Sequence, residues 1–175
     1  MLTTLVFRVS AQEELKKKET PLDSFPTISL QEVKLTGIRA KQNTPVTFTN
    51  VTQKDIASRN LGQDIPILLN YLPAVVTTSD AGAGIGYTGI RVRGSDATRV
   101  NVTLNGIPYN DAESQGTFWV NLPDFASSIQ QIQLQRGVGT STNGSAAFGA
   151  SLNVETSGVQ QDAFTSLSSS IGSFN

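Results

Sequence analysis

Residues 90–108 read IRVRGSDATRVNVTLNGIP, and the stretch begins with apolar and charged side chains in alternation. Ile90 and Val92 fall on one side of this alternation, and Arg91 and Arg93 fall on the other. A period of two residues is typical of a β-strand that buries one of its faces. We therefore expect a strand here, with the apolar residues directed toward a core and the arginines directed away from it.

The second half of the stretch alternates in the same way and ends in Asn105-Gly106. This dipeptide is a strong signal for a two-residue hairpin turn, because both positions tolerate the left-handed backbone that the turn needs. Similar short runs predict further strands elsewhere in the chain, at 32–38, 46–51, 74–79, 130–137 and 151–157.

Residues 55–73 place apolar side chains at approximately helical spacing. Asp55 is the expected cap of a first short turn, and Asp64 is the expected cap of the main helix. Pro66 lies near the N-terminus of this helix, where a missing N–H is tolerated, and Pro73 ends it.

A second, shorter helix is expected at 122–129, and loops rich in glycine or polar residues are expected at 80–89, 109–119 and 138–150. The predicted fold class is therefore α+β. It combines a mixed sheet of short strands with one or two short helices and long Gly-rich loops. Long loops in a compact domain are commonly functional.

Composition excludes several classes of function. The 175 residues carry a formal net charge of −1, which gives no electrostatic case for nucleic-acid binding. The chain has no cysteine and no histidine, so disulfides, thiolate chemistry and the usual zinc sites are excluded. No nucleophile–base pair can be assembled either, so we expect neither an enzyme nor a cofactor.

The basic residues change in kind along the sequence. Lys54 is the last lysine, and the basic residues after position 60 are Arg91, Arg93, Arg99 and Arg136. Arginine makes planar, bidentate contacts and is the preferred cation in buried or interface ion pairs. The later part of the chain therefore has the composition of a surface packed against a partner.

The first residues, MLTTLVFRVSA, have a short apolar run and a small-residue ending, and we interpret 1–11 as the truncated end of a signal peptide, with an ordinary flexible N-terminus as an equal alternative. No run approaches the roughly 20 apolar residues of a membrane-spanning helix. Residues 12–29 are charged and contain two prolines, which predicts a flexible linker.

Four segments together resemble the plug domain of a TonB-dependent outer-membrane receptor. LQEVKLTG at 30–37 resembles the TonB box, and LGQDIPILLNYLPAVV at 61–76 resembles the family's helix followed by proline. The stretch at 90–108 resembles a family signature, and so does IQQIQLQRGVGTSTNGSAAFGASLNVET at 129–156. Lys34 and Val138 depart from the family pattern, which usually has an apolar residue and a proline at these places.

The resemblance implies a domain organisation. It assigns 30–36 to the TonB box, 37–160 to the plug and 161–175 to the start of a first barrel strand. In the family the plug fills the lumen of a large barrel in the outer membrane of a Gram-negative bacterium. TonB adds a strand to the box from the periplasmic side. The residues implied in TonB binding are Leu30, Glu32, Val33, Lys34, Leu35 and Thr36.

The resemblance also implies two sets of contact residues. The candidates for substrate contact, in the apical loops, are Ser79, Asp80, Tyr87, Tyr109, Asn110 and Trp119. For Phe118 and Trp119, packing in the core is an equal alternative. The candidates for ion pairs with the barrel are Arg91, Arg93 and Arg136. The implied partners are TonB, the chain's own barrel and a small-molecule or oligosaccharide substrate, such as an iron chelate, haem, cobalamin or an oligosaccharide.

An alternative from another class is a secreted β-rich module for ligand binding or adhesion that works alone. A free-standing module is expected to finish its last strand and protect its edges. The sequence FTSLSSSIGSFN at 164–175 instead alternates as an open amphipathic strand, which favours the plug.

Overall fold

A computed structural model describes residues 38–158, Ala163 and Thr165. The expectations for the signal peptide, the linker and the TonB box concern residues outside this range, as does nearly all of the expected barrel strand. The strand expected at 32–38 also lies outside it, except for Ile38. No helix in the described part of the chain has the length and apolar character needed to cross a membrane.

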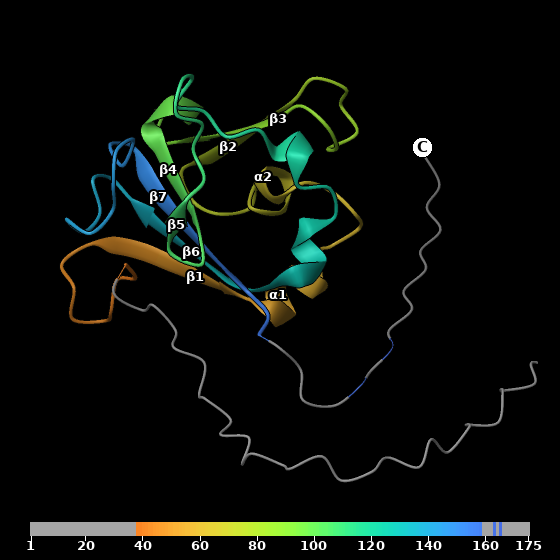
Figure 1. The fold of residues 1–175 in the computed structure, drawn as a ribbon, viewed down its shortest axis with the longest axis horizontal. Coiled ribbons are helices and arrows are strands. Elements are labelled where there is room, and N and C mark those ends of the chain that lie inside the picture. Colours follow the sequence, from red (N-terminus) through yellow and green to blue (C-terminus); the bar gives the residue numbers. More distant parts are fainter. Residues whose placement is uncertain (1–37, 159–162, 164, 166–175) are drawn as a thin grey trace, which may run out of the picture. The chain divides into compact units, whose positions relative to one another are not determined.

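A mixed five-stranded sheet is the main element of the fold (Figure 1). Its strand order is β1-β6-β7-β4-β5, in which β4 and β7 are parallel and the other neighbours are antiparallel. The strands are β1 (Thr47–Thr52), β4 (Val100–Leu104), β5 (Ile107–Pro108), β6 (Ile129–Arg136) and β7 (Ala150–Thr156). The expected mixed sheet of short strands is thus confirmed.

A second sheet contains only β2 (Val75–Ser79) and β3 (Thr88–Val92), which pair antiparallel. Ile90 and Val92 are 2% and 0% exposed, whereas Arg91 and Arg93 are exposed. The alternation in the sequence therefore predicted the two faces of β3 correctly.

The predicted hairpin is also present, because β4 and β5 pair antiparallel around Asn105-Gly106. Both turn residues have positive φ, 50° for Asn105 and 85° for Gly106, as a type I′ turn requires. The side chain of Asn105 ties the turn to β7, since its Nδ2 donates to Thr156 Oγ1 at 2.9 Å.

The first short turn and the helix after Asp64, both expected within 55–73, are present as α1 (Gln53–Ala57) and α2 (Ile65–Leu68), but α2 is shorter than predicted. Gly62, with φ of 88°, interrupts the helical path between them. The helix α2 ends at Leu68, well before Pro73.

Asp55 is not the cap of its helix, whereas Asp64 occupies the predicted position without a capping hydrogen bond from its side chain. Thr52 caps α1, and Asp55 is the third helical residue, whose carboxylate accepts from the Thr52 N–H in a capping box. Asp64 occupies the cap position of α2, but its Oδ2 accepts from Thr88 Oγ1 at 2.7 Å instead of from the helix backbone. The second helix, expected at 122–129, is the 3₁₀ turn η3 (Phe125–Ser128), and two further turns are η1 (Ala97–Arg99) and η2 (Trp119–Asn121).

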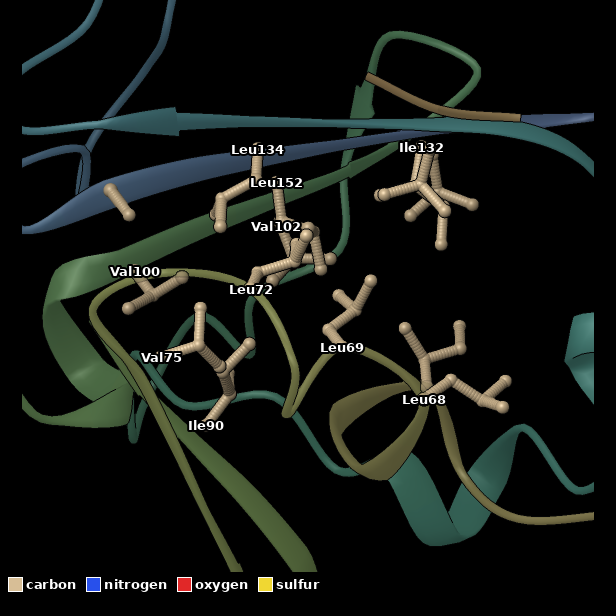
Figure 2. Close-up of a cluster of buried hydrophobic side chains, with 14 of the residues drawn as sticks. Leu68, Leu69, Leu72, Val75, Ile90, Val100, Val102, Ile132, Leu134 and Leu152 are labelled. Atoms are coloured by element: carbon tan, nitrogen blue, oxygen red, sulfur yellow. The ribbon is translucent and has the colours of Figure 1, made fainter. Parts of the chain in front are cut away.

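The hydrophobic core lies on one face of the five-stranded sheet (Figure 2). Leu134 and Leu152 point from this face toward Leu69 and Leu72, and Val75 and Ile90 of the second sheet close the same cluster. The core is thus assembled from both sheets and the segment around α2.

The opposite face of the five-stranded sheet is polar and is buried as well. In the register of the sheet, Gln133 lies beside Asn50 on β1 and Asn153 on β7, and Asn153 lies beside Thr103 on β4. The side chain of Gln133 is 1% exposed and that of Gln135 is 0% exposed. The sequence predicted that these glutamines lie opposite Ile132 and Leu134, but it did not reveal that they are buried.

Candidate functional site

The arginines of the opening stretch lie at the end of β3. Arg93 has φ of 52° and begins a tight turn, in which Ser95 N–H donates to Val92 O at 3.0 Å. This turn directs the Arg93 guanidinium toward Gly137, where an added Cβ would lie 3.5 Å from Nη1. Neither Arg91 nor Arg93 forms an ion pair with a carboxylate in the described part of the chain.

Arg136, at the end of β6, is in a different situation because it is only 8% exposed. Its Nε donates to Pro73 O at 3.0 Å and its Nη1 donates to Thr49 Oγ1 at 2.9 Å. Its Nη2 is buried and has no partner among the described residues. Burial lowers the pKa of Arg136, and the nearby charge of Arg93 lowers it further. The three predicted ion-pair arginines thus comprise two exposed cations and one that is anchored inside the domain.

The loop between β2 and β3 is held at its middle residue, Gly84, while its two end residues are exposed. Asp64 N–H donates to Gly84 O at 3.0 Å, and Gly84 N–H donates to Ser79 Oγ at 3.1 Å. Ser79 therefore orders the loop. Asp80 and Tyr87, the latter 67% exposed, present their side chains to the surface.

The loop at 109–117 is organised around Asn110. Its Oδ1 accepts from Val102 N–H at 2.7 Å, and its Nδ2 donates to Val100 O and Gln115 O, both at 2.9 Å. The amide of Asn110 is therefore used within the protein, and Tyr109 beside it packs against the core. Neither residue has the free polar surface that Asp80 and Tyr87 have.

Asp111 closes a turn in the same loop, since its Oδ2 accepts from the backbone N–H of Ser114 at 2.7 Å and from Ser114 Oγ at 2.8 Å. These hydrogen bonds hold the pKa of Asp111 below its usual value. The turn is therefore intact at neutral pH. The stability that the Asp111 carboxylate contributes to the folded state is lost only as the pH falls below the ordinary carboxyl range.

Trp119 has to be removed from the set of candidate surface contacts. It is 2% exposed and belongs to the hydrophobic core, whereas its neighbour Phe118 is 45% exposed. The physical reason is that η2 turns the indole inward, where burying a large aromatic surface stabilises the fold. The alternative of core packing is thus correct for Trp119.

The structure places the candidate residues on different elements and does not gather them into one site. Tyr87 and Asp80 are on the β2–β3 loop, Arg91 and Arg93 follow on β3, and Arg136 ends β6. The predicted TonB-binding residues, 30–36, lie outside the described residues. In the described part there is no group of three acidic side chains that could hold a metal ion.

Comparison with known families matches a family model, TonB-dependent Receptor Plug Domain, to residues 40–151. The chain belongs to this family. The matched residues include β1 to β6 and the first two residues of β7. Membership of the family disfavours the alternative of a secreted adhesion module.

The plug is also similar to individual proteins. It is 28% identical over 148 residues to the vitamin B12 transporter BtuB of Vibrio cholerae, covering 83% of this chain and 24% of the relative. The chain thus spans about a quarter of the length of the curated relatives that it matches.

Solved structures share the fold of the plug. The siderophore receptor PirA from Acinetobacter baumannii gives a TM-score of 0.50 at 22% identity, over 65% of this chain and 17% of that one. A ferric enterobactin receptor, PfeA from Pseudomonas aeruginosa, gives 0.50 at 23% identity, over 63% and 17%.

Sequence reasoning missed the ordering role of Asn110 and the buried glutamines of β6. An asparagine directly after a hairpin strand is a weak indication of such a role, because this side chain bonds easily to nearby backbone. For Gln133 and Gln135, the available signal was the run of polar residues at alternate positions in several strands, which predicts a polar sheet face.

Proposed function

We propose that the plug is the gate of an outer-membrane receptor that takes up a nutrient, with a barrel around it and TonB acting from the periplasm of a Gram-negative bacterium. The observation that carries this proposal is the family match over residues 40–151, on a fold with its own hydrophobic core. The plug then acts by binding and occlusion, without making or breaking bonds. Its matched relatives are transporters and receptors, not enzymes.

The proposed cargo is a bulky nutrient such as cobalamin or an iron chelate. BtuB is a vitamin B12 transporter, and PirA is a siderophore receptor. The residues that we propose to meet the cargo are Asp80 and Tyr87, which the β2–β3 loop presents at its surface. Ser79 and Asn110 are half-buried and use their side chains in hydrogen bonds within the plug, and half-buried Tyr109 packs against the core. We propose a smaller share of the contact with the cargo for these three residues.

The proposed TonB-binding segment is 30–36, directly before the first described residues. A peptide of residues 28–40 is expected to bind the periplasmic domain of TonB, and Val33→Pro in the peptide is expected to weaken binding about tenfold, because proline removes a backbone donor from the added strand. Isothermal titration calorimetry measures both affinities. Val33→Thr, which keeps the donor and the β-branched shape, is the matched control. An unmodified peptide without detectable binding would contradict the assignment of the TonB box.

Arg91 and Arg93 are proposed to pair with carboxylates of the barrel. Both are exposed and unpaired among the described residues, and an unpaired charge inside an assembled receptor is costly. In the complete receptor, replacing both by alanine is expected to raise passive leakage of a small solute about tenfold. Arg59→Ala is the control, because that arginine stacks on Tyr71 at 3.8 Å within the plug.

Leakage and plug retention that stay unchanged in the double variant would sink the proposed ion pairs. Arg136 is less suited to this test, although we keep it in the proposed set. Its replacement also removes the hydrogen bonds to Pro73 and Thr49, so a loss of folding and a loss of pairing would look alike.

A further inference from the structure

The polar sheet face defined above is covered by a short segment from the start of the described chain. This segment, Ile38–Ala40, which we call the strap, has its contacts on β6 and β7. Ala40 is 6% exposed. The polar face under the strap and the neighbouring loop carries buried side chains, namely Asn101, Thr103, Gln133, Gln135, Ser151 and Asn153.

Gln133 holds the strap by two hydrogen bonds to a single residue. Ala40 N–H donates to Gln133 Oε1 at 2.7 Å, and Gln133 Nε2 donates to Ala40 O at 3.0 Å. One side-chain amide therefore satisfies both backbone groups of Ala40, as a neighbouring strand would do. The same Nε2 also donates to Asn50 Oδ1 at 2.8 Å, which fixes the orientation of the amide.

Two further contacts hold the two strap residues that precede Ala40. Gln135 Nε2 donates to Ile38 O at 3.1 Å and to Gln133 Oε1 at 2.9 Å, which links the two glutamines. Arg39 Nη1 forms an ion pair with Glu155 Oε2 at 2.8 Å, and both side chains are partly exposed. Side chains of the sheet thus make each of these contacts with the strap.

The chemistry under the strap makes its departure inexpensive. Apart from the Glu155 carboxylate, the groups uncovered on the polar face are amides and hydroxyls, which water satisfies, so the net loss per hydrogen bond is about 1 kcal/mol. Opening the other face of the sheet would instead expose Leu134 and Leu152, at a hydrophobic cost of about 2 kcal/mol for each side chain. The strap is therefore attached to the side of the sheet that tolerates water.

The closed state also leaves a polar group without a partner on this face. Asn153 Nδ2, beside Gln133 in the register of the sheet, is buried and has no hydrogen-bond partner among the described protein groups. A buried polar group that lacks a partner disfavours the closed state, and access of water relieves this penalty. The low cost of exposing polar groups and the presence of an unpaired one both favour release of the strap from this face.

We propose that the strap is a releasable cover, which leaves the polar face as a unit while the hydrophobic core stays folded. Gln133 is the positioning residue of this device, and the ion pair between Arg39 and Glu155 supports it. The released surface carries amides and hydroxyls, together with the carboxylate of Glu155. The proposal concerns only segments of this chain and is tested without TonB and without a barrel.

The test measures hydrogen exchange of backbone amides in the whole chain, residues 1–175, by nuclear magnetic resonance. Without substitution, the Ala40 amide is expected to exchange through a local opening, with a rate that hardly depends on low urea concentrations. The amide of Leu134 is expected to exchange through global unfolding, with a steep dependence on urea. Equal rates and equal urea slopes for the two amides would overturn the proposal.

Gln133→Met keeps the length of the side chain but removes both hydrogen bonds to Ala40. It is expected to accelerate exchange at Ala40 about tenfold more than at Leu134. Thr103→Val is the matched control, because Thr103 Oγ1 donates to Asn153 Oδ1 at 2.7 Å on the same face and none of its hydrogen bonds reaches the strap. The proposal is overturned if the ratio of the two exchange rates stays constant in Gln133→Met, or if Thr103→Val raises it equally.

A charge reversal gives a second readout that leaves the glutamines intact. Arg39→Glu is expected to accelerate exchange at Ala40 severalfold, and Glu155→Arg added to it is expected to restore a slower rate, because the ion pair then forms with reversed polarity. A double variant that exchanges faster at Ala40 than Arg39→Glu alone would count against the ion pair as part of the device.

Discussion

Replacing Trp119 by alanine is expected to lower the free energy of unfolding of the chain by about 3 to 5 kcal/mol. The indole is 2% exposed and packs in the hydrophobic core, so the substitution removes buried apolar area and leaves a cavity that the neighbours fill only in part. Urea denaturation followed by circular dichroism measures the change. Fluorescence is unsuitable, because Trp119 is the single tryptophan of the chain.

Tyr87→Ala is the control for this prediction. Tyr87 is 67% exposed, so its loss is expected to change the free energy of unfolding by no more than about 0.5 kcal/mol. If Tyr87 meets the cargo, the same substitution in the complete receptor reduces affinity for the cargo. A Trp119→Ala variant as stable as the original chain would contradict the placement of the indole in the core.

Replacing Gly149 by alanine is expected to lower the free energy of unfolding by about 1 to 3 kcal/mol. A Cβ at this position would lie 2.4 Å from Ser95 Cβ and 3.2 Å from the backbone oxygen of Arg99. Gly149 N–H donates to the same Arg99 oxygen at 2.8 Å, so the two backbones cannot separate without losing this hydrogen bond. Thermal unfolding followed by circular dichroism measures the loss.

Gly144→Ala, in the same loop, is the matched control. There the nearest atom to an added Cβ is Asn101 Nδ2 at 4.0 Å, which is ordinary contact. The substitution is expected to be neutral or slightly stabilising, since alanine restricts the unfolded chain. Equal losses at the two positions would show that the close approach of Gly149 to Ser95 is not the cause.

The strands of this plug could be predicted because their patterns are local. The alternation at Ile90 and Val92 identifies the buried face of β3, and Asn105-Gly106 identifies the turn between β4 and β5. At both places the sequence pattern agrees with the structure because the constraint, side-chain alternation in a strand or positive φ in a turn, operates within a few residues. No distant segment is needed to satisfy either of them.

The predictions that were wrong concern places where a residue far away in the sequence decides the local structure. The helical spacing at 55–73 continues across Gly62, but the backbone there takes a left-handed turn, and the Asp64 carboxylate bonds to Thr88 on β3. Local capping rules assign this carboxylate to the helix backbone, but a residue far away in the sequence occupies it instead. The burial of Gln133 could not be predicted for the same reason, because the residue that packs over it, Ala40, is far away in the sequence.

The pairing of β1 with β6 has a consequence for the order in which the domain acquires its structure. Thr47 lies opposite Arg136 and Thr52 lies opposite Gln131, while β7 follows still later in the chain. During synthesis, β1 therefore emerges from the ribosome long before the strand that completes it. Loop closure over such a separation is slow compared with local helix formation. The nascent chain thus carries an unpaired strand until residue 136 is available, and such a strand is prone to aggregation.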